Sequence, residues 1–221
     1  MEEKDNTADQ EFLNNWWKIK GSNNKSPALK HFHVMSLISK HSFPLCDIGA
    51  GLGLFMRLLE GNWSDKKIFG VDGSNYAVLN KQCTSEIYFS DIRSWAPSEH
   101  VETVTMIDVL EHLPEPKKVL EHVKSYTNHL IIACPNFNFI KGRLEMLLGD
   151  IPFQNRIGRG GHVYWCNYYE LRKMFSELSL EIVEECHMYP RRKNKLLGYF
   201  FSKFPAVFAH EFIFKLRLKR S

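Results

Sequence analysis

Three aspartates in the first half of the sequence each follow a short apolar run, a position from which a side chain can bind a ligand. They are Asp47, Asp72 in the stretch GVDGS, and Asp91 in the stretch FSDI. The stretch after the first aspartate is rich in small residues, namely Gly49, Ala50, Gly51 and Gly53. Glycines allow tight turns and let a ligand approach the backbone closely. A nucleoside suits this set, because Asp72 can accept hydrogen bonds from both ribose hydroxyls and Asp91 one from an adenine amino group.

The spacing of the glycines bears on which nucleotide such a pocket can hold. In the dinucleotide fingerprint G-x-G-x-x-G, the third glycine lets the pyrophosphate press against the start of a helix. Leu54 stands at that third position here. The pattern therefore disfavours a nicotinamide cofactor and predicts a nucleoside pocket without a phosphate site.

Short apolar runs alternate with helical patterns along the chain, and this alternation must position the aspartates. We expect helices over residues 9–19, 27–40, 53–60, 74–83, 115–126 and 167–178. We expect strands over residues 43–49, 66–72, 86–91, 101–109, 129–135, 178–190 and 206–220. Strands that alternate with helices predict an α/β fold with a doubly wound, mostly parallel sheet. The last two strand segments are joined by a basic, aromatic stretch instead of a long helix, which predicts an antiparallel edge.

The size of the chain favours a single structural domain, since 221 residues are enough for one well-buried core. Within it, we expect residues 1–40 to form an N-terminal helical cap and residues 41–221 to form the ligand-binding domain. The N-terminus is acidic and polar and has no signal-peptide pattern. No apolar stretch approaches the roughly 20 residues that cross a membrane. We therefore expect a cytoplasmic protein.

The stretches DIGAGLG, GVDGS, SDI and DVLEHLPEP, in this order and spacing, resemble the motif set of class I S-adenosylmethionine-dependent methyltransferases. The resemblance spans roughly residues 43–189 and is greatest to the MetW-like branch and to small methyltransferases of bacterial surface-glycan pathways. It implies a seven-stranded Rossmann-like methyltransferase fold with a reversed last strand, and S-adenosylmethionine as the cofactor. It also implies the cofactor-binding residues Asp47, Gly49, Ala50, Gly51, Gly53, Asp72, Gly73, Asp91, Ile92, Asp108 and Val109.

The resemblance assigns a part of the cofactor to several of these residues. Asp47 would orient the glycine loop and receive the cofactor's ammonium group, directly or through water. Asp72 would take the ribose hydroxyls, and Asp91 the adenine edge with Ile92 beside the ring. The loop that contains Asp108 and Val109 would line the reacting end of the pocket.

Two histidines lie in loops where an acceptor can bind. Methyl transfer is an in-line displacement, and a base is useful when the acceptor is a hydroxyl or an amine. We favour His162, in the stretch GRGGHVYW, as the catalytic residue, with a hydrogen-bonding role in a lid as the alternative. For His112 we favour a structural role. The five cysteines are scattered and form no C-x-x-C pair, so we expect neither a zinc site nor another metal site.

Three function classes remain open. The leading one is an enzyme that methylates a small molecule or a sugar or glycan precursor, at oxygen or nitrogen. The second is a MetW-like protein that acts as a non-catalytic or regulatory partner of a biosynthetic enzyme. The third is a membrane-surface methyltransferase of a lipid-linked substrate. We expect no nucleic-acid partner, because the net charge of +4 is mild and no nucleic-acid module is recognisable.

Two aromatic regions allow both a functional and a structural interpretation. Trp16 and Trp17 can cover the cofactor pocket from the N-terminal helix, or anchor that helix to the core. Residues 190–203 combine basic and apolar side chains and can contact a membrane surface, although a solvated sheet edge explains them too.

Overall fold

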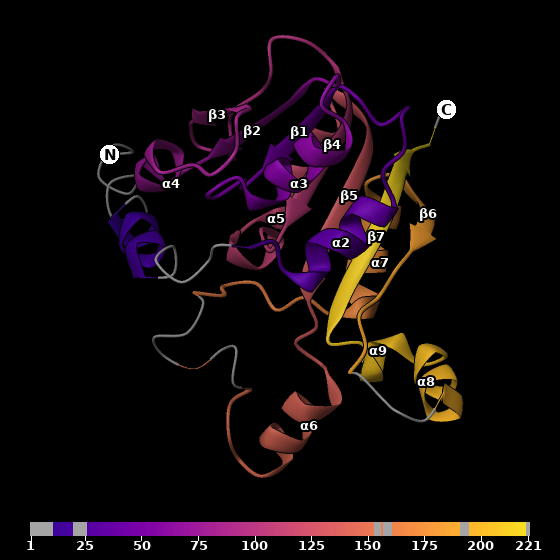
Figure 1. Ribbon diagram of the computed structural model, residues 1–221. Coiled ribbons are helices and arrows are strands. Elements are labelled where there is room, and N and C mark those ends of the chain that lie inside the picture. Colours follow the sequence, from indigo (N-terminus) through magenta and orange to yellow (C-terminus); the bar gives the residue numbers. More distant parts are fainter. Residues whose placement is uncertain (1–10, 20–25, 153–155, 157–160, 191–194, 220–221) are drawn as a thin grey trace. The chain divides into compact units, whose positions relative to one another are not determined.

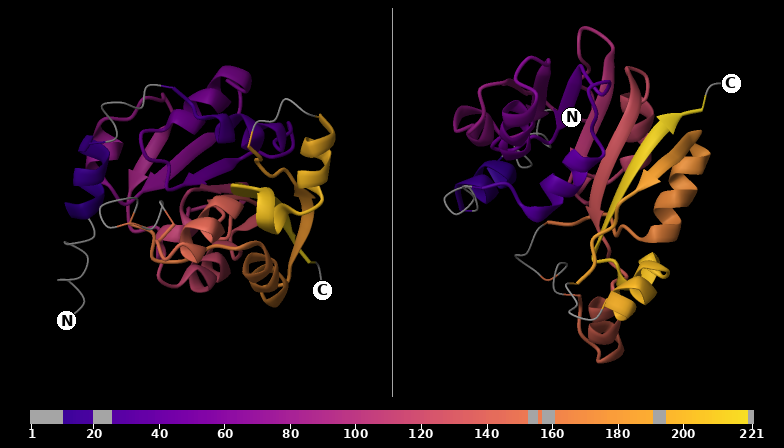
Figure 2. Two further views of the ribbon diagram at one scale, coloured as in Figure 1. Left: turned by 90° about the horizontal axis from the view of Figure 1, so that it is seen from below. Right: turned by 45° about the vertical axis from the view of Figure 1, so that its right-hand side comes forward.

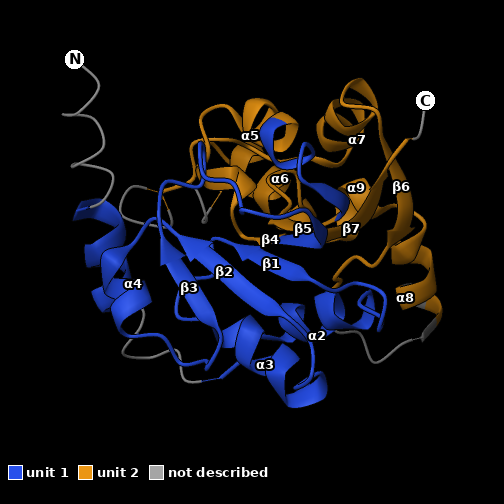
Figure 3. Cartoon of the chain, turned by 90° about the horizontal axis from the view of Figure 1, so that it is seen from above, with its two compact units in different colours: residues 1–105, 122–129 blue, residues 106–121, 130–221 orange. Residues whose placement is uncertain are grey.

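The computed structural model of the chain describes residues 11–19, 26–152, 156, 161–190 and 195–219. It divides into two compact units (Figure 3). Unit 1 comprises residues 1–105 and 122–129, and unit 2 comprises residues 106–121 and 130–221. The predicted division into residues 1–40 and 41–221 stays a prediction.

The strands form a seven-stranded sheet in the order β3-β2-β1-β4-β5-β7-β6 (Figure 1). Their bounds are β1 Leu45–Ile48, β2 Ile68–Asp72, β3 Glu86–Phe89, β4 Val101–Ile107, β5 Thr127–Pro135, β6 Leu180–Glu185 and β7 Glu211–Leu218. Strand β1 pairs in parallel with β2, and β2 with β3, whereas β6 and β7 are antiparallel. The predicted fold class is therefore confirmed, including the reversed last strand.

In unit 1, the parallel pairing brings the ends of three strands together. Asp47 is in register with Gly70, and Asp72 with Phe89. Every residue of β1 and β2 is buried, as expected for parallel strands covered on both faces. The helices of this unit are α2 Leu29–Ser36, α3 Leu54–Asn62, α4 Asn75–Leu79 and a helix over residues 11–19. Figure 3 shows α3 lying along one face of β1 to β3.

Unit 2 contains the short 3-10 helix η1 and most of the later helices. Their bounds are η1 Leu110–His112, α6 Ile140–Leu147, α7 Tyr168–Glu177, α8 Lys195–Ser202 and α9 Pro205–Phe208. Helix α5, Pro116–Val123, begins in unit 2 and ends in unit 1. The large side chains Phe175, Phe212 and Phe214 are fully buried and form part of the core between α7 and the β6–β7 pair.

The connection between β6 and β7 holds two short helices, α8 and α9, where we expected a basic, aromatic stretch instead of a long helix. The last strand was predicted to begin at residue 206, but β7 begins only at Glu211. Pro205 lies in the first turn of α9, where its fixed φ favours a helix start. Helix α4 is also shorter than the predicted 74–83, because it ends at Leu79. Among the described residues, no helix is both long and apolar enough to cross a membrane.

Candidate functional site

The glycine-rich loop after β1 has a backbone that only glycine adopts without strain. Gly49, Gly51 and Gly53 have φ values of 72°, 54° and 72°, all in the left-handed region. The amides of Gly49 and Ala50 both donate hydrogen bonds to the carbonyl oxygen of Val71, at 2.8 and 3.1 Å. These hydrogen bonds fasten the loop to the neighbouring strand β2, and Gly53 is the N-cap of helix α3.

Asp72 holds this loop through its buried carboxylate. Its Oδ2 accepts a hydrogen bond from the Gly51 amide at 2.7 Å, and its Oδ1 accepts one from the Ser74 amide at 2.8 Å. Burial raises the pKa of the carboxyl group, and these two hydrogen bonds act against that shift. A carboxylate has about four acceptor positions, so two backbone donors leave room for two hydroxyl donors.

Asp47 lies at the end of β1, and its side chain is also buried. The hydroxyl of Thr105 donates a hydrogen bond to its Oδ1 at 2.5 Å. Burial is the main cause that raises the pKa of Asp47 to about 7; the Thr105 hydrogen bond lowers it, and the nearby charge of Asp72 raises it further. A cation next to Asp47 would favour its ionised form.

Asp91 follows β3, and its carboxylate accepts hydrogen bonds from Arg93, two residues later. Its Oδ2 accepts a hydrogen bond from Nη2 of Arg93 at 2.8 Å, and its Oδ1 accepts one from the Arg93 amide at 2.9 Å. Partial burial would raise the pKa of Asp91, but the hydrogen bonds and charge of Arg93 lower it overall. Part of its acceptor capacity is therefore used locally. Ile92 and Gly73 lie beside this turn and the end of β2, at the same end of the parallel strands.

The helix over residues 11–19 contacts the glycine loop and the end of β2. A Cβ atom added to Gly51 would lie 2.3 Å from Cζ2 of Trp17, so the indole packs directly on the bare glycine. Asn14 accepts hydrogen bonds from the Ser74 hydroxyl and the Tyr76 amide, at 2.8 and 3.0 Å. Trp17 also packs against a buried cluster with Leu52. The Trp17 side chain therefore both covers the glycine loop and anchors the N-terminal helix.

In unit 2, the loop after β4 begins with an unusual backbone conformation. Asp108 has a φ of 56°, which is strained for a residue other than glycine, and its amide donates to the Ala133 carbonyl at 2.9 Å. Val109 next to it is buried. Such strain persists only where the surroundings hold it in place, and it is frequent at functional sites.

His162 lies next to two other side chains of unit 2, Glu111 and His112. One ligand atom of each of these three residues lies within 4.8 Å of the others. The two imidazole centroids are 5.0 Å apart, and Nδ1 of His112 lies 3.3 Å from the Gly161 carbonyl oxygen. His162, which was predicted to be catalytic, and His112, for which a structural role was favoured, are therefore neighbours.

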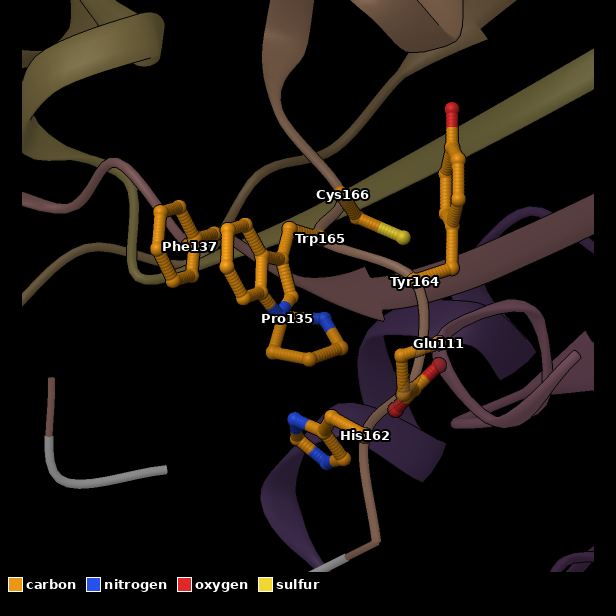
Figure 4. Close-up of a pocket in the computed structure, with 7 residues that line it drawn as sticks. All are labelled: Glu111, Pro135, Phe137, His162, Tyr164, Trp165 and Cys166. Atoms are coloured by element: carbon orange, nitrogen blue, oxygen red, sulfur yellow. The ribbon is translucent and has the colours of Figure 1, made fainter. Parts of the chain in front are cut away.

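Two members of this group, Glu111 and His162, border a small pocket that is partly open to solvent and has a cavity volume of about 10 Å³. Its lining residues are Glu111, Pro135, Phe137, His162, Tyr164, Trp165 and Cys166 (Figure 4). Trp165 is stacked on Phe137, with ring centroids 4.8 Å apart and an interplanar angle of 3°. The pocket thus combines a polar side, where the Glu111 carboxylate lies beside the His162 ring, with a flat aromatic side.

Glu111, Phe137 and Trp165 were not among the site residues predicted from the sequence. Glu111 is 2% exposed, which is unusual for a glutamate. The polar residues around it in the sequence indicated an exposed loop, so its burial could not be predicted. Its position directly before His112 was the only available signal. Trp165 lies three residues after His162 in the stretch GRGGHVYW, and this proximity was a signal for adding it to the predicted acceptor site.

A family model described as a methyltransferase domain matches residues 11–185. The chain belongs to this methyltransferase family. The match confirms the predicted recognition as a class I S-adenosylmethionine-dependent methyltransferase, and with it the predicted cofactor. The finer resemblance to the MetW-like branch stays a prediction. Among proteins of curated function, none matches the sequence significantly.

Solved structures with the same fold agree with this family. Magnesium protoporphyrin IX methyltransferase from Synechocystis, with bound S-adenosylhomocysteine, has a TM-score of 0.64 and 16% identity, over 97% of this chain and 100% of that one. An S-adenosylmethionine-dependent methyltransferase from Archaeoglobus fulgidus has a TM-score of 0.62 and 15% identity, over 91% of this chain and 99% of that one. A putative methyltransferase from Haloferax volcanii, in complex with its Trm112 activator, has a TM-score of 0.62 and 14% identity, over 96% and 98% of the two chains. At these identities the likeness concerns the fold.

Proposed function

We propose that this methyltransferase transfers the methyl group of S-adenosylmethionine to a hydroxyl or amine of a small molecule or of a sugar or glycan precursor. The observation that carries the proposal is the buried carboxylate of Asp72, which holds the bare-backbone glycine loop and keeps acceptor positions for two more donors. A ribose diol supplies two such donors. The pocket in unit 2, with its polar side and its stacked Trp165, supports an acceptor that has both a hydroxyl or amine and a flat face.

The cofactor-binding roles follow the chemistry of each side chain. Asp47, with its pKa near 7, pairs with the ammonium group of the cofactor, which favours the ionised carboxylate. Gly49, Ala50, Gly51 and Gly53 present backbone without side chains, and Gly73 extends this surface at the end of β2. Asp91 and Ile92 take the adenine, the former through the acceptor capacity that Arg93 leaves. Asp108 and Val109 line the reacting end.

His162 is the proposed catalytic residue on the acceptor side. During transfer the carbon–sulfur bond of the sulfonium breaks, its electron pair stays on sulfur, and a bond forms between the methyl carbon and the acceptor atom. An acceptor hydroxyl or amine loses a proton in this step, and an imidazole is a suitable base near neutral pH. His162 borders the pocket, which is the position that such a role requires.

Calorimetric titration with S-adenosylmethionine and S-adenosylhomocysteine tests the cofactor half of this proposal. Wild-type protein should bind both, and Asp72→Asn should bind both more weakly while it still folds. Absence of binding to folded wild-type protein would contradict the proposal. Acceptors would then be screened by following the release of S-adenosylhomocysteine, beginning with sugars and small hydroxylated metabolites.

A methyltransferase of lipid-linked substrates is the second candidate, and the exposed apolar side chains of two helices favour it. Leu147 and Leu148 at the end of α6 are 82% and 84% exposed, and Leu196 of α8 is 77% exposed. Both helices lie at the same end of unit 2, away from the C-terminus (Figures 1 and 2). Lys141 of α6 and Lys203 after α8 are exposed near these leucines in sequence, a combination that suits an anionic lipid surface. Residues 191–194 of the predicted basic segment lie outside the described residues.

Sedimentation with vesicles of phosphatidylglycerol and phosphatidylcholine tests the membrane candidate. Wild-type protein should sediment with the anionic vesicles, and the double variant Leu147→Ser with Leu148→Ser should not. Leu79→Ser is a matched control, because Leu79 is 75% exposed in unit 1. Equal sedimentation of all three proteins, or of none, would count against this candidate.

The MetW-like partner role stays a prediction with its own test. One solved structure of the same fold is a complex between a putative methyltransferase and an activator protein. If this chain has a comparable partner, a homoserine acyltransferase is the one that the MetW-like resemblance implies. Co-purification of the two proteins, together with cofactor binding and no turnover with any acceptor, would support regulation over catalysis.

A further inference from the structure

We propose that Glu111, His112 and His162 bind one divalent transition-metal cation, with the chemistry of Zn²⁺, and that this cation holds an oxygen of the methyl acceptor. All three residues lie in unit 2. The inference that the cation acts on the acceptor rests on the proposed function, whereas the metal site itself rests on the geometry of these side chains. It revises the expectation, made from the scattered cysteines, that the chain has no metal site.

The ligand atoms of the three side chains converge. They lie within 4.8 Å of one another, and bonds of about 2.0–2.2 Å to a common ion would draw them to roughly 3–4 Å apart. To share one ion, the three side chains would therefore have to rotate toward one another. Two imidazoles and one carboxylate suit zinc and similar ions, whereas magnesium and calcium prefer sites made of oxygen alone.

The hydrogen bond made by His112 leaves its Nε2 atom suited to bind a metal. Its Nδ1 lies 3.3 Å from the Gly161 carbonyl oxygen, and a carbonyl can only accept a hydrogen bond. Nδ1 must therefore donate, which leaves the lone pair of the neutral ring on Nε2. Histidine ligands of metals are commonly held in this way, through a backbone carbonyl that fixes the tautomer and the orientation of the ring.

The backbone brings His162 to the other two residues. The amides of Val163 and Tyr164 both donate to the carbonyl oxygen of Glu111, at 2.8 and 3.0 Å. At the other end of this segment, the Phe137 amide donates to the Cys166 carbonyl at 2.9 Å. These bonds hold the segment after His162 in place and present its side chain beside the Glu111 carboxylate (Figure 4).

Burial adds an electrostatic reason for a cation at this place. Glu111 is 2% exposed, and a carboxylate that is removed from water is stabilised by a positive charge close to it. Exposed acidic groups gather without an ion on many proteins, but this carboxylate is not exposed. A cation would interact favourably with this carboxylate and would keep coordination positions open for other ligands, because the described residues supply three.

A bound cation would change the chemistry of the acceptor side. Coordination lowers the pKa of a hydroxyl, so the acceptor releases its proton to water near neutral pH. The resulting oxygen attacks the methyl carbon as the carbon–sulfur bond breaks. In this arrangement His162 acts as a ligand instead of as a base, and an acceptor with two neighbouring oxygens gains affinity by occupying two open positions.

Metal binding can be measured without cofactor or acceptor. Full-length protein without a histidine tag is stripped with a chelator, dialysed and titrated with Zn²⁺ by calorimetry. We expect one site of micromolar or tighter affinity, and at least a tenfold loss of affinity in Glu111→Gln and in His162→Ala. His100→Ala is the control, since His100 is an exposed histidine of unit 1, and its affinity should equal that of wild type. No Zn²⁺ binding by folded wild-type protein, or equal affinity in all four proteins, would overturn the proposal.

Titration with Co²⁺ gives a second readout, because its visible absorption depends on the number and type of its ligands. Wild-type protein should give a spectrum that Zn²⁺ abolishes by competition, and His162→Ala should alter it. S-adenosylhomocysteine binding is measured on the same preparations. Retained cofactor binding without metal binding rejects the metal site alone, whereas loss of cofactor binding by folded protein rejects the proposed function.

Discussion

The glycine loop of unit 1 and the Glu111–His112–His162 group of unit 2 are assembled in different ways. In unit 1, the carboxylate of Asp72 accepts hydrogen bonds from backbone amides, and the ligand surface is largely backbone. In unit 2, three side chains come together because two loops about 50 residues apart are joined by backbone hydrogen bonds. A ligand surface made of backbone suits a ligand that is common to a whole family. A site made of side chains can be adapted to a different acceptor by a few substitutions.

The sharpest test of this difference is Asp72→Ala. It removes the charged acceptor proposed for the ribose and leaves the Gly51 and Ser74 amides without their partner. We expect the affinity for S-adenosylhomocysteine to fall at least 100-fold, or about 3 kcal/mol. Calorimetry measures the affinity, and circular dichroism verifies the fold. His162→Ala is the comparison and should bind within twofold of wild type; an equal loss in both variants would show that the two sites are not separable.

Asp47→Asn tests the cost of keeping a carboxyl group buried in unit 1. The pKa of Asp47 is about 7 in the folded protein, against an ordinary value of 3.8. Between these values the folded protein holds a proton that the unfolded chain has lost, so the free energy of unfolding falls as the pH rises and levels off above 7. The asparagine cannot titrate, and we expect it to stabilise the protein by about 2–4 kcal/mol at pH 8, with the gain shrinking toward pH 4.

Urea unfolding at pH 5 and pH 8 measures this gain. Asp91→Asn is the matched control in the same unit, because the hydrogen bonds and charge of Arg93 lower the pKa of Asp91 overall. That variant should gain no stability at pH 8. A gain in Asp47→Asn that does not depend on pH would mean that burial of charge is not its cause.

His162→Ala should affect turnover and not cofactor affinity. We expect kcat to fall about 100-fold or more with an identified acceptor, because a positioned base contributes roughly 10²–10⁴-fold to the rate. Loss of a ligand that activates the acceptor should also lower kcat. Steady-state assays of wild type and variant give kcat and KM separately. If added imidazole restores the activity of His162→Ala, the result would favour a role of His162 as a base. If excess Zn²⁺ restores it, the result would favour a role as a metal ligand. Unchanged turnover would remove His162 from both roles.

The smallest expected effect concerns the aromatic side of the unit 2 pocket. Trp165 is 59% exposed and stacked on Phe137, so Trp165→Ala should leave stability nearly unchanged. We expect KM for an acceptor with a flat face to rise about fivefold, or about 1 kcal/mol, with kcat little changed. Tyr169→Ala, at an exposed aromatic residue outside the pocket, is the control. An equal change in both variants would argue against acceptor stacking on Trp165.

The strands and the loop of unit 1 were predictable because their signals are local. The apolar runs before Asp47 and Asp72 have the length of buried strands, and the glycines between them indicate a backbone with positive φ. The two helices before β7 were not predicted, because the alternating side chains around Phe208 and His210 also suit a strand. Pro205 was the local signal for the start of α9.

The sequence by itself determined the order of the strands, the glycine backbone of the loop after β1 and the identity of the acids at the strand ends, because each depends on residues close together in the chain. Only the tertiary structure decided that Trp17 packs on Gly51 and that Glu111 and His112 meet His162. Those contacts join residues that lie some 30 to 50 positions apart. They depend on how loops are held by backbone hydrogen bonds, which no local pattern of residue types encodes.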